Sequence, residues 1–115
     1  HMKYPHSESL KKNQDFQLLY KEGKSCANRY LVLYVRENGL GRNRFGVSVS
    51  KKVGNSVVRH RITRLIRESY RLHEDRFNSG LDMAVIARAS AKGRSMAEIE
   101  SALLHLGKLQ GVFKK

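Results

Sequence analysis

The stretch "FGVSVSKKVGNSVVRHRITRLIRESYR", residues 45–71, changes its hydrophobic period halfway along. Phe45 and the two valines after it alternate with small residues, which predicts a strand with one buried face. A Gly-Asn pair ends the alternation, and Asn55 or Ser56 can cap a helix that continues to about Phe77. A strand followed directly by a long helix favours an α/β fold.

The predicted helix has an apolar side and a basic side. At 100° per residue, the apolar side has a single polar member and comprises Val58, Ile62, Leu65, Ile66, Ser69 and Leu72. The opposite side carries His60, Arg64, Arg67 and Arg71, with Arg61 at its border. An ordinary outer face mixes Glu with Lys, whereas the five arginines from Arg59 to Arg71 meet only Glu68. Because Arg can bind phosphate through two parallel hydrogen bonds, this pattern favours a phosphate-binding face over a merely solvated one.

The positive charge of the chain is concentrated in the same region. The whole sequence has 23 Lys and Arg against 10 Asp and Glu, a formal net charge of +13. Residues 42–71 contain nine of these cations and one acid, which gives that segment a net charge of +8. Such a local excess indicates an anionic partner, because like charges would otherwise destabilise the folded state.

The rest of the sequence predicts a sheet with helices packed on it. A short strand is expected at 25–28 and longer strands at 29–37 and 81–88. The strand at 81–88 is expected in the middle of the sheet, and a hairpin turn is expected at Asn38-Gly39. A helix should begin at Asn13 and end at Gly23. Ser95 and Glu98 form a capping box before a final helix whose core face is Ile99, Ala102, Leu103 and Leu106. The predicted fold is an α/β protein, an α+β two-layer sandwich. Its three- to four-stranded sheet carries an N-terminal helix, a long basic helix and a C-terminal helix.

Length and composition predict a single domain that spans residues 2–115, and His1 is interpreted as a residue of an expression vector. The single cysteine cannot form an internal disulfide and no signal peptide is expected, so the predicted compartment is the cytoplasm. No apolar run approaches the ~18 residues of a membrane span. The histidines and acids show no spacing typical of a metal site, which disfavours a nuclease that works alone.

Residues 45–71 resemble the signature segment of the bacterial ribonuclease P protein subunit. In that family a strand ending in Ser-Lys-Lys leads through a Gly-Asn turn into a helix with an Arg-Asn-Arg core. The similarity extends to "LKKNQDFQLLYKEGKSCANRYLVLY" (residues 10–34) and "MAVIAR" (residues 83–88). His60 stands where the family has its central Asn, and Thr63 stands where it has a basic residue. "RNR" at residues 42–44 matches by letters alone and is given no such role.

The resemblance implies a protein subunit that helps a catalytic RNA remove the 5′ leader from precursor tRNA. The RNA subunit and its Mg²⁺ ions would carry out the endonucleolytic reaction, while the protein alone would be inactive and would need no protein partner. It also implies a ribosomal-protein-like fold with a left-handed βαβ crossover. The expected contacts with the catalytic RNA are Lys51, Lys52, Asn55, Arg59, His60, Arg61, Arg64, Arg67 and Arg71.

A second candidate surface combines aromatic and small polar residues. Phe16 and Tyr20 are neighbours on one helix face, while Tyr30 and Tyr34 are expected on one face of a strand. Rings beside cations can stack a single strand of nucleic acid, although an ordinary core is the alternative. The family resemblance assigns such a cleft to the tRNA leader. The expected members are Phe16, Tyr20, Tyr30, Tyr34, Ser48, Ser50 and Arg88.

Two other functions are compatible with the same charge pattern. A ribosomal or general RNA-binding protein would need the same basic helix but would have no part in processing. A polybasic protein at a membrane surface would need bulky apolar residues opposite the charges and no partner sheet, so it is disfavoured.

Overall fold

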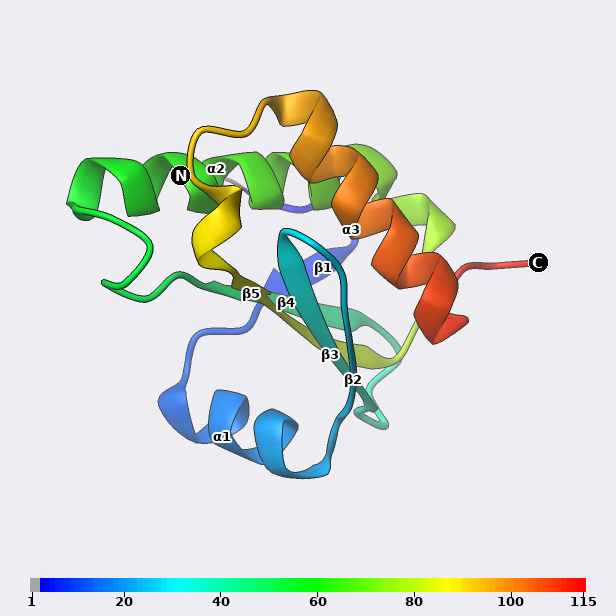
Figure 1. Cartoon of the computed structure of the whole chain (residues 1–115). Coiled ribbons are helices and arrows are strands. Elements are labelled where there is room, and N and C mark those ends of the chain that lie inside the picture. Colours follow the sequence, from blue (N-terminus) through cyan, green and yellow to red (C-terminus); the bar gives the residue numbers. More distant parts are fainter. Residues whose placement is uncertain (1–2) are drawn as a thin grey trace.

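A five-stranded sheet runs through the middle of the protein, in the order β1-β4-β5-β3-β2 (Figure 1). The computed structural model describes residues 3–115, and the predicted vector residue His1 lies outside them. The strands are Ser7–Ser9 (β1), Lys24–Ala27 (β2), Leu31–Glu37 (β3), Asn43–Ser48 (β4) and Leu81–Ala87 (β5). The prediction of three to four strands was wrong. Its missing strand is β1, whose Ser-Glu-Ser sequence has no apolar residue to indicate a strand.

The predicted hairpin at Asn38-Gly39 was also wrong. Gly39 does turn the chain, with φ at +69°, but β5 lies between the two strands that this turn connects. β5 pairs antiparallel with β3 and parallel with β4, which confirms its predicted position in the middle of the sheet. The parallel pair β4 and β5 is connected through a helix, so the chain contains a βαβ unit. The left hand of this crossover stays a prediction.

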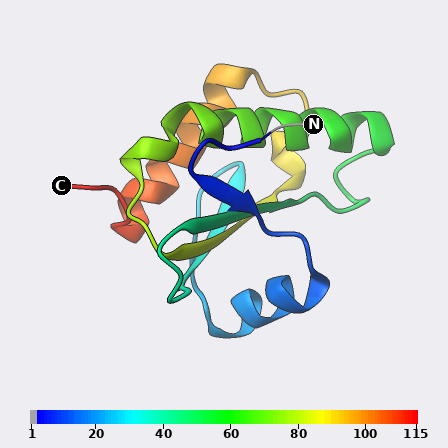
Figure 2. The same cartoon turned by 180° about the vertical axis from the view of Figure 1, so that it is seen from behind.

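Helices cover both faces of the sheet (Figures 1 and 2). α2 (Ser56–His73) and α3 (Met96–Gln110) pack together on one face, over the larger hydrophobic core. α1 (Asn13–Glu22) covers the other face through a smaller cluster centred on Leu19 and Ala84. The α/β class is therefore confirmed, but the two-layer prediction omitted one layer. Among residues 3–115, no helix is long and apolar enough to cross a membrane.

The ends of the two long helices follow the predicted caps. The Asn55 side chain accepts a hydrogen bond from the backbone N–H of Val58 at 3.0 Å and begins α2. At α3, the Ser95 hydroxyl accepts from the backbone N–H of Glu98, and the Glu98 carboxylate accepts from the backbone N–H of Ser95, which completes a capping box. All four predicted core residues of α3 are buried, so the position and rotation of this helix are confirmed.

The core face of α2 is centred on Ile62, Ile66 and Tyr70, which lie one helical turn apart and are all buried. Leu72 was predicted in the core, but its side chain is 53% exposed. Tyr70 takes the place in the core, stacking on Phe45 with ring centroids 4.0 Å apart. The Tyr70 ring packs toward β4 and the N-terminal segment, so the buried face of α2 points that way and Leu72 lies outside it.

Arg44 connects the sheet to α1. Its guanidinium donates two hydrogen bonds to the carboxylate of Asp82 on β5, at 2.8 and 2.6 Å, and lies 3.5 Å from Asp15 on α1. The side chain of Asp82 is only 4% exposed. Burial acts to raise the pKa of Asp82, but hydrogen bonds from Arg44 and Asn38 outweigh it and lower that pKa. Arg44 is therefore engaged inside the fold.

Candidate nucleic-acid interface

The outer face of α2 carries a row of exposed cationic side chains, His60, Arg61, Arg64 and Arg67, which we call the basic stripe. A groove of about 450 Å³ follows it, lined by Val57, His60, Arg61, Arg64, Leu65 and Glu68. Glu68 is the only acid of α2, and its carboxylate accepts a hydrogen bond from Arg71 at 3.0 Å. This contact occupies Arg71, and the one carboxylate of α2, which also lies near Arg64, is outnumbered by the cations of the stripe.

The turn before α2 extends this positive surface. Lys51 and Lys52 are both exposed there, directly before the N-terminus of the helix. The unpaired backbone N–H groups at a helix N-terminus attract anions, so the two lysines and the helix N-terminus both favour the binding of an anion. Asn55, predicted to contact RNA, uses its side-chain oxygen for the helix cap instead.

Arg59 and Arg61 lie at the sides of the stripe and are partly engaged within the protein. Arg61 donates to the carbonyl oxygen of Arg94 at 3.2 Å, which joins α2 to the loop before α3. The Nε atom of Arg59 is buried, and within residues 3–115 it has no hydrogen-bond partner. Thr63, at the position where a basic residue was expected, donates to the carbonyl oxygen of Arg59. The structure therefore places the predicted cations on one surface, where Arg59 and Arg61 are partly engaged within the protein and Lys51, Lys52, Arg64 and Arg67 are exposed.

On the opposite face of the sheet, Phe16, Tyr20 and Tyr34 form a row of half-buried rings, which we call the aromatic trough. The ring centroids of Phe16 and Tyr20 are 6.1 Å apart, and those of Tyr20 and Tyr34 are 5.0 Å apart. Burial raises the pKa of the Tyr20 hydroxyl, and the nearby Ser48 hydroxyl offsets part of this effect. The rings retain enough exposure to contact a ligand from solvent.

The sheet beneath these rings is made of small residues. Tyr34 pairs with Ala84, and Ala84 pairs with Gly46 on the next strand. A Cβ atom on Gly46 would lie 2.5 Å from the Cζ atom of Phe16, so the absence of a side chain there is what lets α1 approach. Gly46 and Ser48 lie on the face of β4 that α1 covers, and Gly46 is buried there beneath Phe16.

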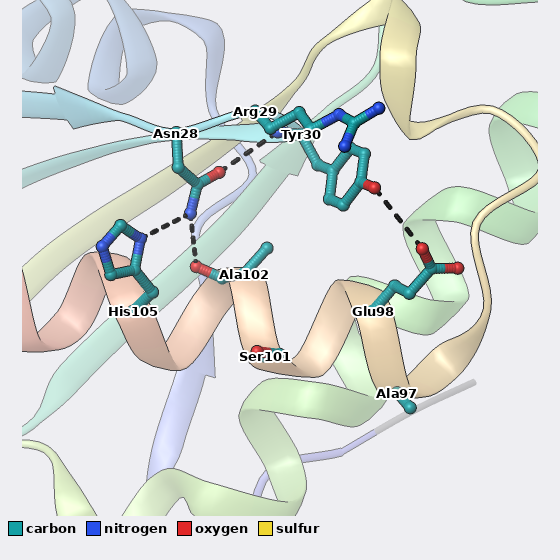
Figure 3. A pocket seen from close by; sticks show the side chains of 8 residues that line it. All are labelled: Asn28, Arg29, Tyr30, Ala97, Glu98, Ser101, Ala102 and His105. Atoms are coloured by element: carbon teal, nitrogen blue, oxygen red, sulfur yellow. Dashed lines mark hydrogen bonds between the residues drawn. The ribbon is translucent and has the colours of Figure 1, made fainter.

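Tyr30 was assigned to the same trough and this assignment was wrong. It precedes β3 and lies on the α3 side, where its hydroxyl donates to Glu98 at 3.4 Å (Figure 3). The alternation rule fails there because residue 30 lies outside the strand. Ser50 and Arg88 are exposed just beyond the ends of β4 and β5, at the same end of the sheet.

Sequence reasoning missed two apolar members of the trough face. Val32 and Ile86 pair with each other in the row next to Tyr34 and Ala84, and both are half-buried. Their alternation with fully buried residues of β3 and β5 could have indicated their position. Among residues 3–115, no group of three or more His, Cys, Asp or Glu side chains is placed to hold a metal ion.

Known proteins match this chain over nearly its whole length. The Ribonuclease P family model matches residues 4–110. A ribonuclease P protein component from Lachnoclostridium phytofermentans is 63% identical over 106 residues, which cover 92% of this chain and 91% of that protein. The corresponding protein of Alkaliphilus metalliredigens is 53% identical over 100 residues, covering 87% and 90%.

Solved structures of similar proteins have the same fold. The RNase P protein from Staphylococcus aureus is 43% identical, with a TM-score of 0.85, and covers 92% of this chain and 97% of its own. The protein from Thermotoga maritima is 34% identical, with a TM-score of 0.78, covering 86% and 94%.

Proposed function

The chain belongs to the ribonuclease P protein family, and we propose that its two surfaces bind two different RNAs during tRNA 5′ processing. The basic stripe, with Lys51 and Lys52, binds the RNA subunit of the enzyme. The aromatic trough binds the 5′ leader of precursor tRNA. The two surfaces lie on opposite faces of one sheet, so one protein can contact both RNAs at once.

The observation that carries the first assignment is the basic stripe itself. Three exposed arginines and a histidine lie along one helix face, and the only acid of that helix is already bound by Arg71. A phosphate backbone presents regularly spaced negative charge, and arginine can hold each phosphate with two hydrogen bonds. An RNA helix is therefore the partner whose charge and spacing suit this face.

The row of rings supports the second assignment. Aromatic side chains stack nucleobases of any sequence, because every base has a π-face. The three rings are half-buried on the sheet face that α1 covers, and their exposed parts would contact the strand. Such a surface suits a leader that differs in sequence from one tRNA to another.

The catalytic reaction belongs, in this proposal, to the RNA subunit, and the protein alone is inactive. Mg²⁺ ions held mainly by the RNA subunit and the substrate supply the activation of water. The cations of this chain reduce the repulsion between two polyanions that must approach each other. The proposed setting is the bacterial cytoplasm, and no further protein partner is required.

Cleavage of precursor tRNA by a bacterial ribonuclease P RNA, with and without this protein, tests the proposal. At low Mg²⁺ the protein should restore cleavage that the RNA alone performs poorly. The protein without RNA should leave the substrate intact at any Mg²⁺ concentration. If the protein binds RNA but does not change the Mg²⁺ requirement, a general RNA-binding function would replace the proposed one.

A further inference from the structure

A hollow of about 510 Å³ lies beside α3, on the face of the sheet opposite the aromatic trough (Figure 3). Its walls come from the segment between β2 and β3 and from one side of α3. The hollow is shallow and open to solvent, with mostly apolar walls and a few polar groups, so it suits a flat group that lies against one wall. None of the residues that line it belongs to the basic stripe or to the aromatic trough.

Tyr30 forms the aromatic wall of this hollow and is held in position before any ligand arrives. Its hydroxyl donates to Glu98, and its ring lies under the guanidinium groups of Arg29 and Arg94, at 5.4 and 5.7 Å. Glu98 does not act as a free acid, because it caps α3 through Ser95 and lies 3.5 Å from Arg94. The hollow therefore has the planar cation of Arg29 on its wall and that of Arg94 behind the Tyr30 ring, and these outnumber the one carboxylate.

At the other end of the hollow, His105 and Ser101 line the wall, and the His105 ring lies beside Asn28 (Figure 3). The side-chain N–H of Asn28 lies 3.2 Å from Nδ1 of His105, while a second bond joins it to the carbonyl oxygen of Ala102. Because Nδ1 accepts from Asn28, the neutral ring carries its proton on Nε2. His105 thus offers one donor, and the Ser101 hydroxyl offers a donor or an acceptor, to the edge of a base.

The hollow and the basic stripe share no lining residue, but the loop before α3 connects them. Arg61 of the stripe donates to the carbonyl oxygen of Arg94, and the guanidinium of Arg94 lies against Tyr30. From Tyr30 the next cation is Arg29, at the far rim. A strand of RNA bound along α2 would therefore find a further line of positive charge leading to the hollow.

We propose that this hollow binds one extruded nucleotide of the ribonuclease P RNA subunit, with its base against Tyr30 and its phosphates at Arg29 and Arg94. Unpaired bases that are turned out of an RNA helix are commonly held between aromatic rings and arginine planes. The inference rests on the proposed binding of the RNA subunit by α2. It adds a contact that reads a single nucleotide, where the stripe recognises only the phosphate backbone.

Filling the hollow tests this inference without removing a charge. Ser101 is exposed, so Ser101→Trp should fill the space and leave the fold unchanged, as circular dichroism can verify. Stacking contributes roughly 1–3 kcal/mol per base, so affinity for a bacterial ribonuclease P RNA should fall at least about fivefold. The slope of log K against log[salt] should stay the same, because no phosphate contact is lost. Leu109→Trp is the matched control, since Leu109 is 55% exposed on the same helix and lies outside the hollow.

Chemical probing of the RNA subunit adds a direct measurement. The unmodified protein should change the reactivity of one unpaired nucleotide, and Ser101→Trp should abolish that change while the other protections persist. If Ser101→Trp misfolds, the smaller Ser101→Leu should give the same pattern. Unchanged affinity with either folded variant, or an equal loss with Leu109→Trp, would overturn the inference.

The same assay separates this inference from the proposed function. If Arg64→Ala with Arg67→Ala weakens RNA binding while Ser101→Trp does not, only the hollow is excluded. If neither change matters, binding of the RNA subunit by α2 fails as well. If only Ser101→Trp weakens binding, the hollow contacts RNA and the stripe does not.

Discussion

Replacing Arg44 with methionine should destabilise the protein by removing the cation that is hydrogen-bonded to a buried carboxylate. The Asp82 side chain is 4% exposed, against 25% for Arg44, and the two share a pair of short hydrogen bonds. Removing one partner of a buried ion pair typically lowers the free energy of unfolding by about 3–5 kcal/mol. Because Arg44 is partly exposed, we expect a loss near the lower end, about 3 kcal/mol. For a chain of 115 residues, this corresponds to a fall in Tm of about 9–15 °C.

The loss should depend on pH. In the unmodified protein the pKa of Asp82 is lowered, so its ion pair stabilises the fold above the unfolded-state pKa of about 3.9. That contribution disappears as the pH falls through the still lower folded-state pKa. In Arg44→Met, burial is no longer outweighed and should raise the pKa of Asp82, so the acid becomes neutral at a higher pH. The difference in stability between the two proteins should therefore be largest near pH 7, and it should shrink as the pH falls from the raised pKa of Asp82 in Arg44→Met to the lowered pKa of the unmodified protein.

Urea unfolding followed by circular dichroism at pH 7 and at pH 4 measures both effects. Arg44→Met with Asp82→Asn is the control, because it removes the uncompensated charge and should recover more than half of the lost stability. An Arg44→Met protein within about 1 kcal/mol of the unmodified one at pH 7 would refute the reasoning. A deficit that does not change with pH would show that lost packing, and not the carboxylate, is responsible.

Three further predictions concern the two RNA surfaces. Tyr34→Ala should weaken binding of precursor tRNA about fivefold or more but hardly affect mature tRNA, as filter binding can measure, and equal losses for both would assign the ring to the core. Arg64→Ala and Arg67→Ala should each lower the slope of log K against log[salt] for the RNA subunit by about 1; a normal slope and affinity would make the stripe a solvated face. Gly46→Ala should push Phe16 away and destabilise the protein by about 1–3 kcal/mol in thermal unfolding, with a smaller preference for precursor tRNA. Full stability in that variant would mean that α1 adjusts freely.

Local patterns predicted the elements well but not their pairing. The caps at Asn55 and Ser95 and the buried positions of α3 follow from residues that are close in sequence. The turn at Gly39 was also recognised, yet the strands on either side of it do not pair, because β5 arrives from more than forty residues away. Strand pairing is a long-range property that a turn sequence does not determine.

The candidate site shows the same division. The basic stripe could be predicted, because helical spacing alone places its residues on one face. Phe16, Tyr20 and Tyr34 do come together, but their meeting depends on α1 crossing the sheet above Gly46. Tyr30 was misplaced, since the three residues of irregular chain between β2 and β3 are enough to turn it toward α3.

The central position of β5 also affects how the chain can fold as it is made. β3 and β4 leave the ribosome first, but the strand that fills the space between them ends only at Ala87. Until then each of the two strands has an unpaired inner edge, and such edges can pair with other chains. Contacts between residues so far apart in sequence also form slowly. A nascent chain that has reached Gly80 therefore cannot close its sheet, and its folding has to wait for the last third of synthesis.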